Sequence, residues 1–393
     1  MDAIRLIIVG LFLLFSYLYI CRGFIIIFPR KKRKYVFISV AIFMFIANSG
    51  FWGARYFRSH GTMPSFFEYI YWVSFTALGL MFFMLSCFFV ADFLAICIFL
   101  ISKNVKKSRV KKQKKMNYDR RAFLNALSLG VAAIFTGFAF VNARRIPQIK
   151  EVNVEIKNLH DELKDFSIVQ ITDLHVGQTI GKKYVEDVVE HINLLQPDIV
   201  VITGDLIDGF VEQIHEWVKP LGTIKAKYGI YYVTGNHEYY WDANGWIDYV
   251  KSLGITYLGN SHQLLNIGKS QVVIAGINDL SAEKFDPSHK MDPAKSIATA
   301  PQFPHLKILL AHQPNSAFEV VKLKYFDLQI SGHTHGGQIW PMTWLIHFIQ
   351  PFHPGLTFFE NMFIYVSRGT GYWGPPARLG SDSEITLLKI KQV

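Results

Sequence analysis

Residues 331–337 read SGHTHGG and follow the run FDLQI at 326–330, whose alternation of apolar and polar residues predicts a strand. Two histidines, His333 and His335, therefore stand two positions apart where that strand ends. Such a pair says little in isolation, because histidine is also common on protein surfaces. Its meaning depends on whether other metal-binding residue types stand at the ends of other strands.

Four further apolar runs in the C-terminal part of the chain end in the same way. The runs FSIVQI, DIVVI, GIYYV and KILLA lead into polar segments: Thr172–His175, Thr203–Asp205, Thr234–Glu238 and His312–Pro314. Helical periodicity at 182–195, and helical character at 212–226 and 241–252, indicate strands that alternate with helices. Because ligands bind at the carboxyl ends of strands in such α/β sheets, we expect these polar segments to meet at one edge.

The polar segments hold eight side chains of metal-binding types, with carboxylate, amide and imidazole donors but no thiolate. They are Asp173, His175, Asp205, Asn236, His237, His312, His333 and His335. Imidazole donors disfavour Mg²⁺ and Ca²⁺ and suit Mn²⁺, Fe or Zn²⁺. This set is too large for one ion, whereas two ions about 3.5–4 Å apart that share a carboxylate would use it fully. Two-metal sites stabilise both the attacking and the leaving oxygen of a phosphoryl displacement.

These residues fall into five short motifs that stand in order over about 165 residues: Asp173-x-His175, Gly204-Asp205, Gly235-Asn236-His237-Glu238, His312 and Gly332-His333-x-His335. Together they resemble the calcineurin-like metallophosphoesterases, and the resemblance extends over about residues 155–393. It implies a four-layer α/β/β/α sandwich with a dinuclear metal site at its top edge. It also implies hydrolysis of a phosphate ester through attack by a metal-activated hydroxide.

The resemblance further implies a role for each motif residue. Asp173, His175 and His335 are expected to bind the first metal, Asp205 to bridge both, and Asn236, His312 and His333 to bind the second. His237 is expected to lie beside the scissile phosphate as the catalytic general acid or charge stabiliser. The cofactors are then two divalent ions, Mn, Fe or Zn, with Mn²⁺ favoured.

Two other residues leave alternatives open. Asp208 either orients a metal ligand from behind or caps a turn or helix. Arg368, after the apolar run FIYVS, either contacts the substrate phosphate or has a structural role. The tail around it, SRGTGYWGPPARLGSDSEITLL at 367–388, resembles a branch of membrane-anchored bacterial phosphodiesterases of the cell envelope.

The N-terminal third differs from the rest in composition and charge. The whole chain is 51% hydrophobic with a mean hydropathy of +0.22, which is too apolar for an ordinary soluble protein. Residues 1–145 hold 21 Lys and Arg against 4 Asp and Glu, whereas residues 146–393 hold 20 against 26. The basic charge therefore flanks apolar spans, and we expect no nucleic-acid partner for the mildly acidic remainder.

We predict a transmembrane region at 1–145 followed by a phosphoesterase domain at 146–393. The expected spans are about 6–28, 35–52, 69–101 and 123–141. Because Lys and Arg gather in cytoplasmic loops, the clusters at 30–34 and 103–121 predict that those loops lie inside. The protein is then integral to the inner or cytoplasmic membrane, with an extracytoplasmic catalytic domain. If the third stretch held two short spans or a re-entrant segment, the side would be reversed.

These features predict a membrane-anchored phosphodiesterase that acts on an envelope or lipid-linked phosphate ester. A first alternative is a pyrophosphohydrolase of the UDP-2,3-diacylglucosamine type in lipid A synthesis, whose cytoplasmic substrate makes topology the discriminating feature. A second is a non-enzymatic metal-binding membrane sensor, against which the complete ligand set argues. The aromatic segment 339–362 is either an irregular loop on the sheet edge or an apolar lip for a lipid tail or bilayer surface.

Overall fold

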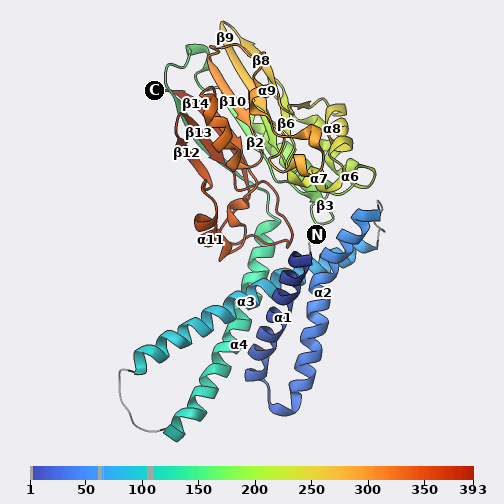
Figure 1. The fold of residues 1–393 in the computed structure, drawn as a ribbon, viewed down its shortest axis with the longest axis vertical. Helices are drawn as coiled ribbons and strands as arrows, with labels where there is room; N and C mark the ends of the chain where they lie inside the picture. Colours follow the sequence, from blue (N-terminus) through green and yellow to red (C-terminus); the bar gives the residue numbers. More distant parts are fainter. Residues whose placement is uncertain (1–2, 61–63, 65, 104–109) are drawn as a thin grey trace. The chain divides into compact units, whose positions relative to one another are not determined.

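The computed structural model describes residues 3–60, 64, 66–103 and 110–393. The chain forms two compact units, one of residues 1–141 with 374–376 and one of residues 142–373 with 377–393. Figure 1 labels the elements of both units. Part of the predicted basic loop, at 104–109, and part of the predicted outer loop, at 61–63 and 65, lie outside the described residues.

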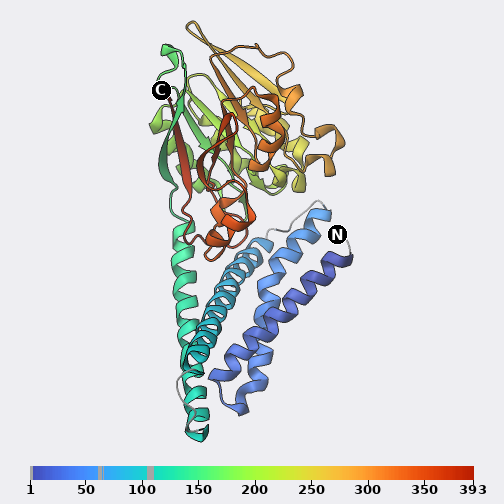
Figure 2. The same cartoon turned by 60° about the vertical axis from the view of Figure 1, so that its left-hand side comes forward.

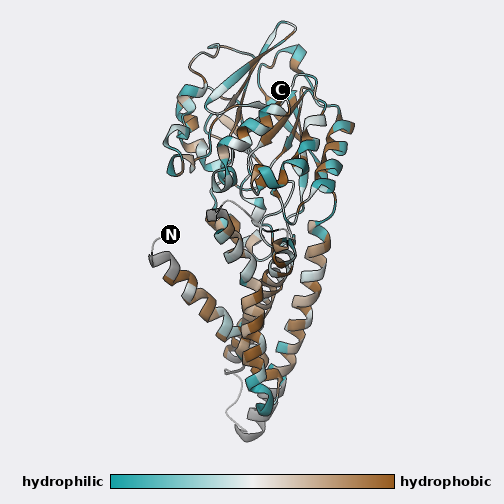
Figure 3. Ribbon diagram, turned by 90° about the vertical axis from the view of Figure 1, so that its right-hand side faces the viewer, coloured by the Kyte–Doolittle hydropathy of each residue, from teal (hydrophilic) through white to brown (hydrophobic). Residues whose placement is uncertain are grey.

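The first unit is built from long apolar helices. They are α1 (Ala3–Ile27), α2 (Arg33–His60), α3 (Phe67–Lys103) and α4 (Val110–Ala143), with a 3₁₀ turn at Arg30–Lys32 before α2. All four contain a stretch long and apolar enough to cross a membrane, as the hydropathy colouring in Figure 3 also shows. The predicted bundle of about four transmembrane helices is confirmed in this sense, and the third stretch is a single helix.

An ion pair joins two of the described helices of the first unit. Arg22 of α1 pairs with Asp92 of α3, and Tyr19 Oη donates a hydrogen bond to Asp92 Oδ2 over 2.8 Å. A charged side chain in an apolar span is expensive unless it is paired. The pair therefore connects two helices while each partner neutralises the other.

The second unit contains two mixed six-stranded sheets. The first has the strand order β1-β14-β2-β4-β6-β7 and consists of Gln148–Ile156, Glu384–Gln392, Ser167–Ile171, Ile199–Thr203, Ile230–Val233 and Thr256–Tyr257. The second has the order β12-β13-β11-β10-β9-β8 and consists of Gly355–Phe359, Met362–Val366, Leu328–Ser331, Leu306–Leu310, Ser270–Gly276 and Ser261–Ile267. A small pair, β3 (Val176–Gly177) with β5 (Ile207–Asp208), stands apart from both.

Seven α-helices flank the sheets. They are α5 (Lys182–Leu195), α6 (Val211–Val218), α7 (Asn236–Trp241), α8 (Ala243–Ser252), α9 (Pro293–Ser296), α10 (Ala317–Val320) and α11 (Met342–Ile349), in the described part of the second unit. Figures 1 and 2 show α11 standing out from the sheets at one edge of this unit.

Three buried apolar clusters separate four layers of this unit. Ile202 of β4 packs with α5 and α8, whereas its neighbour Val201 points the other way and joins Ile308 of β10 between the sheets. Leu309, the next residue of β10, packs with α10 on the outer side of the second sheet. Successive strand residues point to opposite faces, so these alternating runs need a layer on each side. The predicted four-layer α/β/β/α sandwich is confirmed.

Strand direction brings the polar segments together. Strands β2, β4 and β6 run parallel in the first sheet, and β9, β10, β11 and β13 run parallel in the second. The carboxyl ends of parallel neighbours lie at the same edge, so the residues after these strands meet there.

Two predicted elements differ in the structure. The helix expected at 212–226 ends as an α-helix at Val218 and continues as a 3₁₀ turn, Lys219–Thr223, because Pro220 has no N–H to donate. The segment 339–362, for which an irregular loop was one expectation, contains the regular helix α11 and strand β12.

Candidate metal centre

The candidate ligands stand on sharp turns directly after the strands. Asp173, His175, Asp205, His333 and His335 all have left-handed backbones, with φ angles of 53°, 50°, 50°, 72° and 49°. Positive φ is uncommon for residues other than glycine and costs free energy, so it persists where the surroundings enforce it. Three of these residues follow strands of the first sheet and two follow β11 of the second, so the strained turns of both sheets direct side chains to the candidate site.

Glycines at this edge allow the turns to approach one another closely. A Cβ on Gly204 would lie 2.6 Å from the backbone nitrogen of Gly235, and a Cβ on Gly332 would lie 2.2 Å from Asp173 Oδ2. Contacts this short exclude any side chain, so both positions require glycine. The glycines of the motifs thus allow neighbouring turns to approach each other closely, in addition to allowing the chain to reverse direction.

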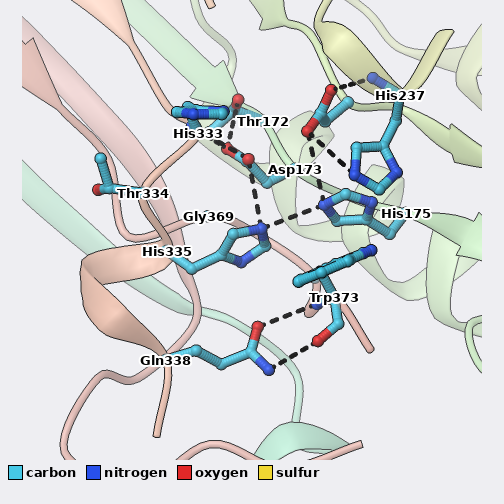
Figure 4. A network of polar contacts seen from close by, with 12 residues as sticks. Thr172, Asp173, His175, His237, His333, Thr334, His335, Gln338, Gly369 and Trp373 are labelled. Carbon is cyan, nitrogen blue, oxygen red and sulfur yellow. Dashed lines mark hydrogen bonds and ion pairs between the residues drawn. The ribbon is translucent and has the colours of Figure 1, made fainter. Parts of the chain in front are cut away.

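One ligand group consists of Asp173, His175 and His335. The Nε2 atoms of His175 and His335 are 3.1 Å apart, and His335 Nε2 lies 3.4 Å from Asp173 Oδ1 (Figure 4). Asp173 is fixed from behind, since its carboxylate accepts hydrogen bonds from the backbone N–H of His333 and from Thr172 Oγ1. Three donor atoms therefore converge on one point.

A second group consists of Asp205, His312 and His333. His312 Nε2 lies 3.2 Å from His333 Nδ1 and 3.2 Å from Asp205 Oδ2. The other ring nitrogen of His312, Nδ1, lies 2.8 Å from the carbonyl oxygen of Thr203 and donates to it, which leaves Nε2 as the acceptor. Asn236 is also buried at this edge, and its Oδ1 has no hydrogen-bond partner.

Asp205 lies between the groups. Its Oδ2 is 3.2 Å from His312 Nε2 of the second group and 3.9 Å from His175 Nε2 of the first. The same oxygen lies 4.0 Å from His237 Nε2, and Oδ1 accepts a hydrogen bond from the His237 backbone N–H over 2.8 Å. One carboxylate thus faces both groups and the candidate catalytic histidine.

His237 belongs to neither group and is held by Asp208. His237 Nδ1 lies 2.5 Å from Asp208 Oδ1, and His175 Nδ1 lies 3.2 Å from Asp208 Oδ2. Trp241 Nε1 donates to the same carboxylate over 3.3 Å. Of the two alternatives for Asp208, the contacts favour the orienting one, because a carboxylate behind two imidazoles fixes which ring nitrogen faces the site.

Glu238 joins two of the loops and was not singled out from the sequence. Its carboxylate accepts hydrogen bonds from the backbone N–H groups of Gly235, Asp205 and Leu206 over 2.6, 3.1 and 2.7 Å. Burial and the nearby charge of Asp205 raise the pKa of Glu238 to about 7. Its position inside the Gly-Asn-His-Glu motif was the available signal.

Arg378 was also missed, although it is among the largest fully buried side chains. Its guanidinium donates to the carbonyl oxygens of Gly371, Ser381 and Arg368, and its Nη2 lies 3.2 Å from His335 Nδ1. Burial lowers the pKa of Arg378 to about 10. Arg368 was the expected candidate in this tail, and nothing in the spacing of the tail distinguishes a buried arginine from an exposed one.

The electrostatics of Asp205 and His335 suit cation binding, whereas the pKa of His312, which burial would lower, is raised well above its usual value by Asp205. Burial opposes ionisation of Asp205, but the neighbouring His312, His237 and His175 outweigh it and hold the pKa of this carboxyl well below its usual value. Burial, together with His175 and Arg378, holds the pKa of His335 well below its usual value. Ionised carboxylates and neutral imidazoles are the forms that bind metals.

The residues present fit two divalent ions. Imidazole nitrogens that face each other at 3.1 and 3.2 Å compete for one proton, whereas a cation between them would satisfy both. The unpartnered Asn236 Oδ1 adds a neutral oxygen donor beside the second group. The donor set, nitrogen and oxygen without sulfur, suits Mn²⁺, Fe or Zn²⁺.

Comparison with known proteins agrees with this geometry. A family model described as calcineurin-like phosphoesterase matches residues 166–337. The chain is 35% identical over 327 residues to a transmembrane protein with metallophosphoesterase domain from Danio rerio, covering 81% of this chain and 73% of that one. It is 37% identical over 268 residues to an uncharacterised metallophosphoesterase of Campylobacter jejuni, covering 67% and 69%.

A Bacillus subtilis relative, also an uncharacterised metallophosphoesterase, is 30% identical over 297 residues that cover 71% of this chain and 99% of the relative. The matched regions include every motif that carries a candidate ligand. The chain belongs to the calcineurin-like metallophosphoesterase family and is a metal-dependent phosphoester hydrolase with four helices suited to a membrane.

Proposed function

We propose that the protein is a membrane-anchored dinuclear phosphodiesterase that hydrolyses an envelope or lipid-linked phosphate ester. The observation that carries this proposal is the pair of ligand groups that share the Asp205 carboxylate. A paired site of this kind favours phosphoryl displacement over single-ion chemistry.

The proposed roles follow the positions of the donor atoms. Asp173, His175 and His335 would hold the first ion, Asn236, His312 and His333 would hold the second, and Asp205 would serve both. When bound, two divalent ions supply Lewis-acid stabilisation of phosphate charge and lower the pKa of water. Mn²⁺ is our expected occupant.

His237 is proposed as the catalytic residue. Burial opposes its protonation, but Asp208 and Asp205 raise the pKa of His237 to about 9. The imidazole can therefore hold a proton near neutral pH and give it to the leaving oxygen or stabilise charge on the phosphate. Asp208 keeps that ring in place through its contact with Nδ1.

The extracytoplasmic position of residues 146–393 is part of the proposal. It is supported by the basic clusters at 30–34 and 103–121 and by the single helix α3 across the third apolar stretch. The alternative, a pyrophosphohydrolase of a nucleotide-linked lipid, requires the opposite side. A reporter active only in the cytoplasm and one active only outside it, each fused after Val393, distinguish the two.

The central experiment measures hydrolysis by the purified full chain in detergent. The substrates are a chromogenic phosphodiester and the matching phosphomonoester, with added Mn²⁺ and with Asn236→Ala as the control variant. We expect diester turnover that is lost in the variant. If neither ester is turned over while metal is shown to be bound, the proposal gives way to a pyrophosphate substrate or a binding module.

A further inference from the structure

An exposed aromatic surface follows directly on the His333/His335 loop. We call Trp340, Trp344, Phe348 and Ile349 the α11 ridge; they are 36%, 60%, 73% and 61% exposed. Trp344 and Phe348 stand four residues apart on one face of α11, with ring centroids 5.1 Å apart. Residues 341–349 include no Asp, Glu, Lys or Arg. Contiguous exposed apolar surface of this kind marks an interaction site.

The helix is held firmly from its other side, so the exposure is not a sign of poor packing. Ile346 is buried, and a Cβ on Gly337 would lie 2.5 Å from the carbonyl oxygen of Met342. The backbone N–H of Trp340 donates to the carbonyl oxygen of Leu379 over 2.8 Å. A rigid helix thus presents its aromatic face outward.

The ridge is connected to the metal centre through Trp373. Gln338 lies in the turn between His335 and α11 and makes two hydrogen bonds to the backbone of Trp373 (Figure 4). Its Nε2 donates to the Trp373 carbonyl, and its Oε1 accepts from the Trp373 N–H, both over 2.9 Å. The Trp373 ring meets His237 edge-on at 5.7 Å and remains 51% exposed. Apolar surface therefore borders the proposed catalytic histidine.

The residues that end the last apolar span pack on the same loops. Ala143, where the span Arg120–Ala143 ends, is buried against Ile180 and Tyr372, and Asn142 Nδ2 donates to Asp382 Oδ1 over 2.7 Å. Tyr372 adjoins Trp373 in the chain. The loop that carries Trp373 therefore packs against the first residues of the second unit.

We propose that the α11 ridge inserts into the interfacial layer of the bilayer, and that the site hydrolyses the phosphodiester of a membrane lipid whose acyl chains remain in the membrane. Trp is favoured at the membrane–water interface, and an amphipathic helix buries its apolar face there. In the reaction a water oxygen forms a bond to phosphorus, the ester bond to the leaving alcohol breaks, and the alcohol departs with a proton. This inference rests on the proposed phosphodiesterase function.

The test uses the full chain reconstituted in vesicles, with a soluble chromogenic diester and a fluorogenic lipid phosphodiester as parallel substrates. We compare wild type, the double variant Trp344→Ser/Phe348→Ser, and Phe303→Ser, which removes a phenylalanine that is 81% exposed outside the ridge. The double variant should lose about tenfold or more in kcat/KM on the lipid but less than about twofold on the soluble diester. Phe303→Ser should change neither.

A second measurement is independent of turnover. Brominated lipids quench tryptophan fluorescence on contact, so wild type minus Trp344→Phe gives the contribution of Trp344 in metal-free protein. We expect that contribution to be quenched by bromines near the headgroup. An unquenched Trp344, or equal loss on both substrates in the double variant, overturns the ridge proposal. Absence of soluble diester turnover in wild type overturns the phosphodiesterase proposal instead, while the quenching result still decides whether the ridge inserts.

Discussion

The two ligand groups of the metal centre are supported by different parts of the protein. The group of Asp173, His175 and His335 is backed by ionisable side chains, because Asp208 contacts His175 and Arg378 contacts His335. In the group of Asp205, His312 and His333, the His312 imidazole is backed by main chain, through the Thr203 carbonyl. Main-chain support survives most substitutions, whereas side-chain support can be removed one residue at a time. Metal binding by the first group should therefore be easier to weaken through substitutions of residues that are not ligands themselves.

The largest expected effect removes the residue that both groups share. Asp205→Ala should lower diester turnover by about 10³-fold or more, because the carboxylate that we propose as the bridge and the support of the His237 backbone are lost together. Metal analysis should find both ions lost. Asp248→Ala, at an exposed carboxylate, is the control, and a variant that retains two ions would refute the shared role.

The next largest effects are expected from substitutions that remove a ligand from only one of the two ligand groups. His335→Ala and His312→Ala should each lower turnover by about 10²-fold or more and each leave about one tightly bound ion per chain. The measurement is metal stoichiometry by mass spectrometry beside the kinetics. If either variant loses both ions, the groups are not independent and the comparison fails.

Asp208→Asn should have a smaller effect, about 10–100-fold in activity or metal affinity, because the amide carries no charge to place beside His237 Nδ1 and His175 Nδ1. Affinity of the first ion should fall while that of the second is kept. If a competition titration showed equal loss of affinity for both ions, Asp208 would not support the first ligand group alone, contrary to our proposal.

Arg378→Lys should have the smallest effect on turnover, below about tenfold, but a clear effect on stability. A lysine cannot serve the carbonyl oxygens of Gly371, Ser381 and Arg368 together, and unsatisfied buried acceptors cost roughly 1–3 kcal/mol each. The apparent melting temperature of the metal-free chain should fall. An unchanged melting temperature would mean that this buried arginine contributes only to the metal site.

Much of the centre was predictable because its ligands follow strands whose apolar runs are local signals. Asp173, Asp205 and His333 each stand within a few residues of a buried run, so sequence order already places them at a strand end. Four apolar spans were equally visible in the N-terminal part. These features depend on neighbours in the chain, which a sequence displays directly.

The features that could not be predicted from the sequence depend on contacts between segments that are distant in the chain. Arg378 is buried because the loop at 367–383 folds over it, and Gln338 matters because Trp373 lies beside it. Helix α11 follows Pro341 and carries Thr343 and His347 among its apolar residues, and its packing decides whether it is helical. Strands β8, β9 and β14 were not predicted. Their places in the sheets depend on the strands with which they pair.

Strand β14 has a consequence for how the protein is made. It lies between β1 and β2, although both of those strands leave the ribosome long before it does. Domains generally fold in the order of synthesis, from the N-terminal side. Here the first sheet cannot close until β14 has been translated, and Thr370, which binds both Thr172 and the Glu384 carbonyl, joins that closing strand to the first ligand loop. The first ligand loop should therefore reach its final position only after β14 has joined the sheet.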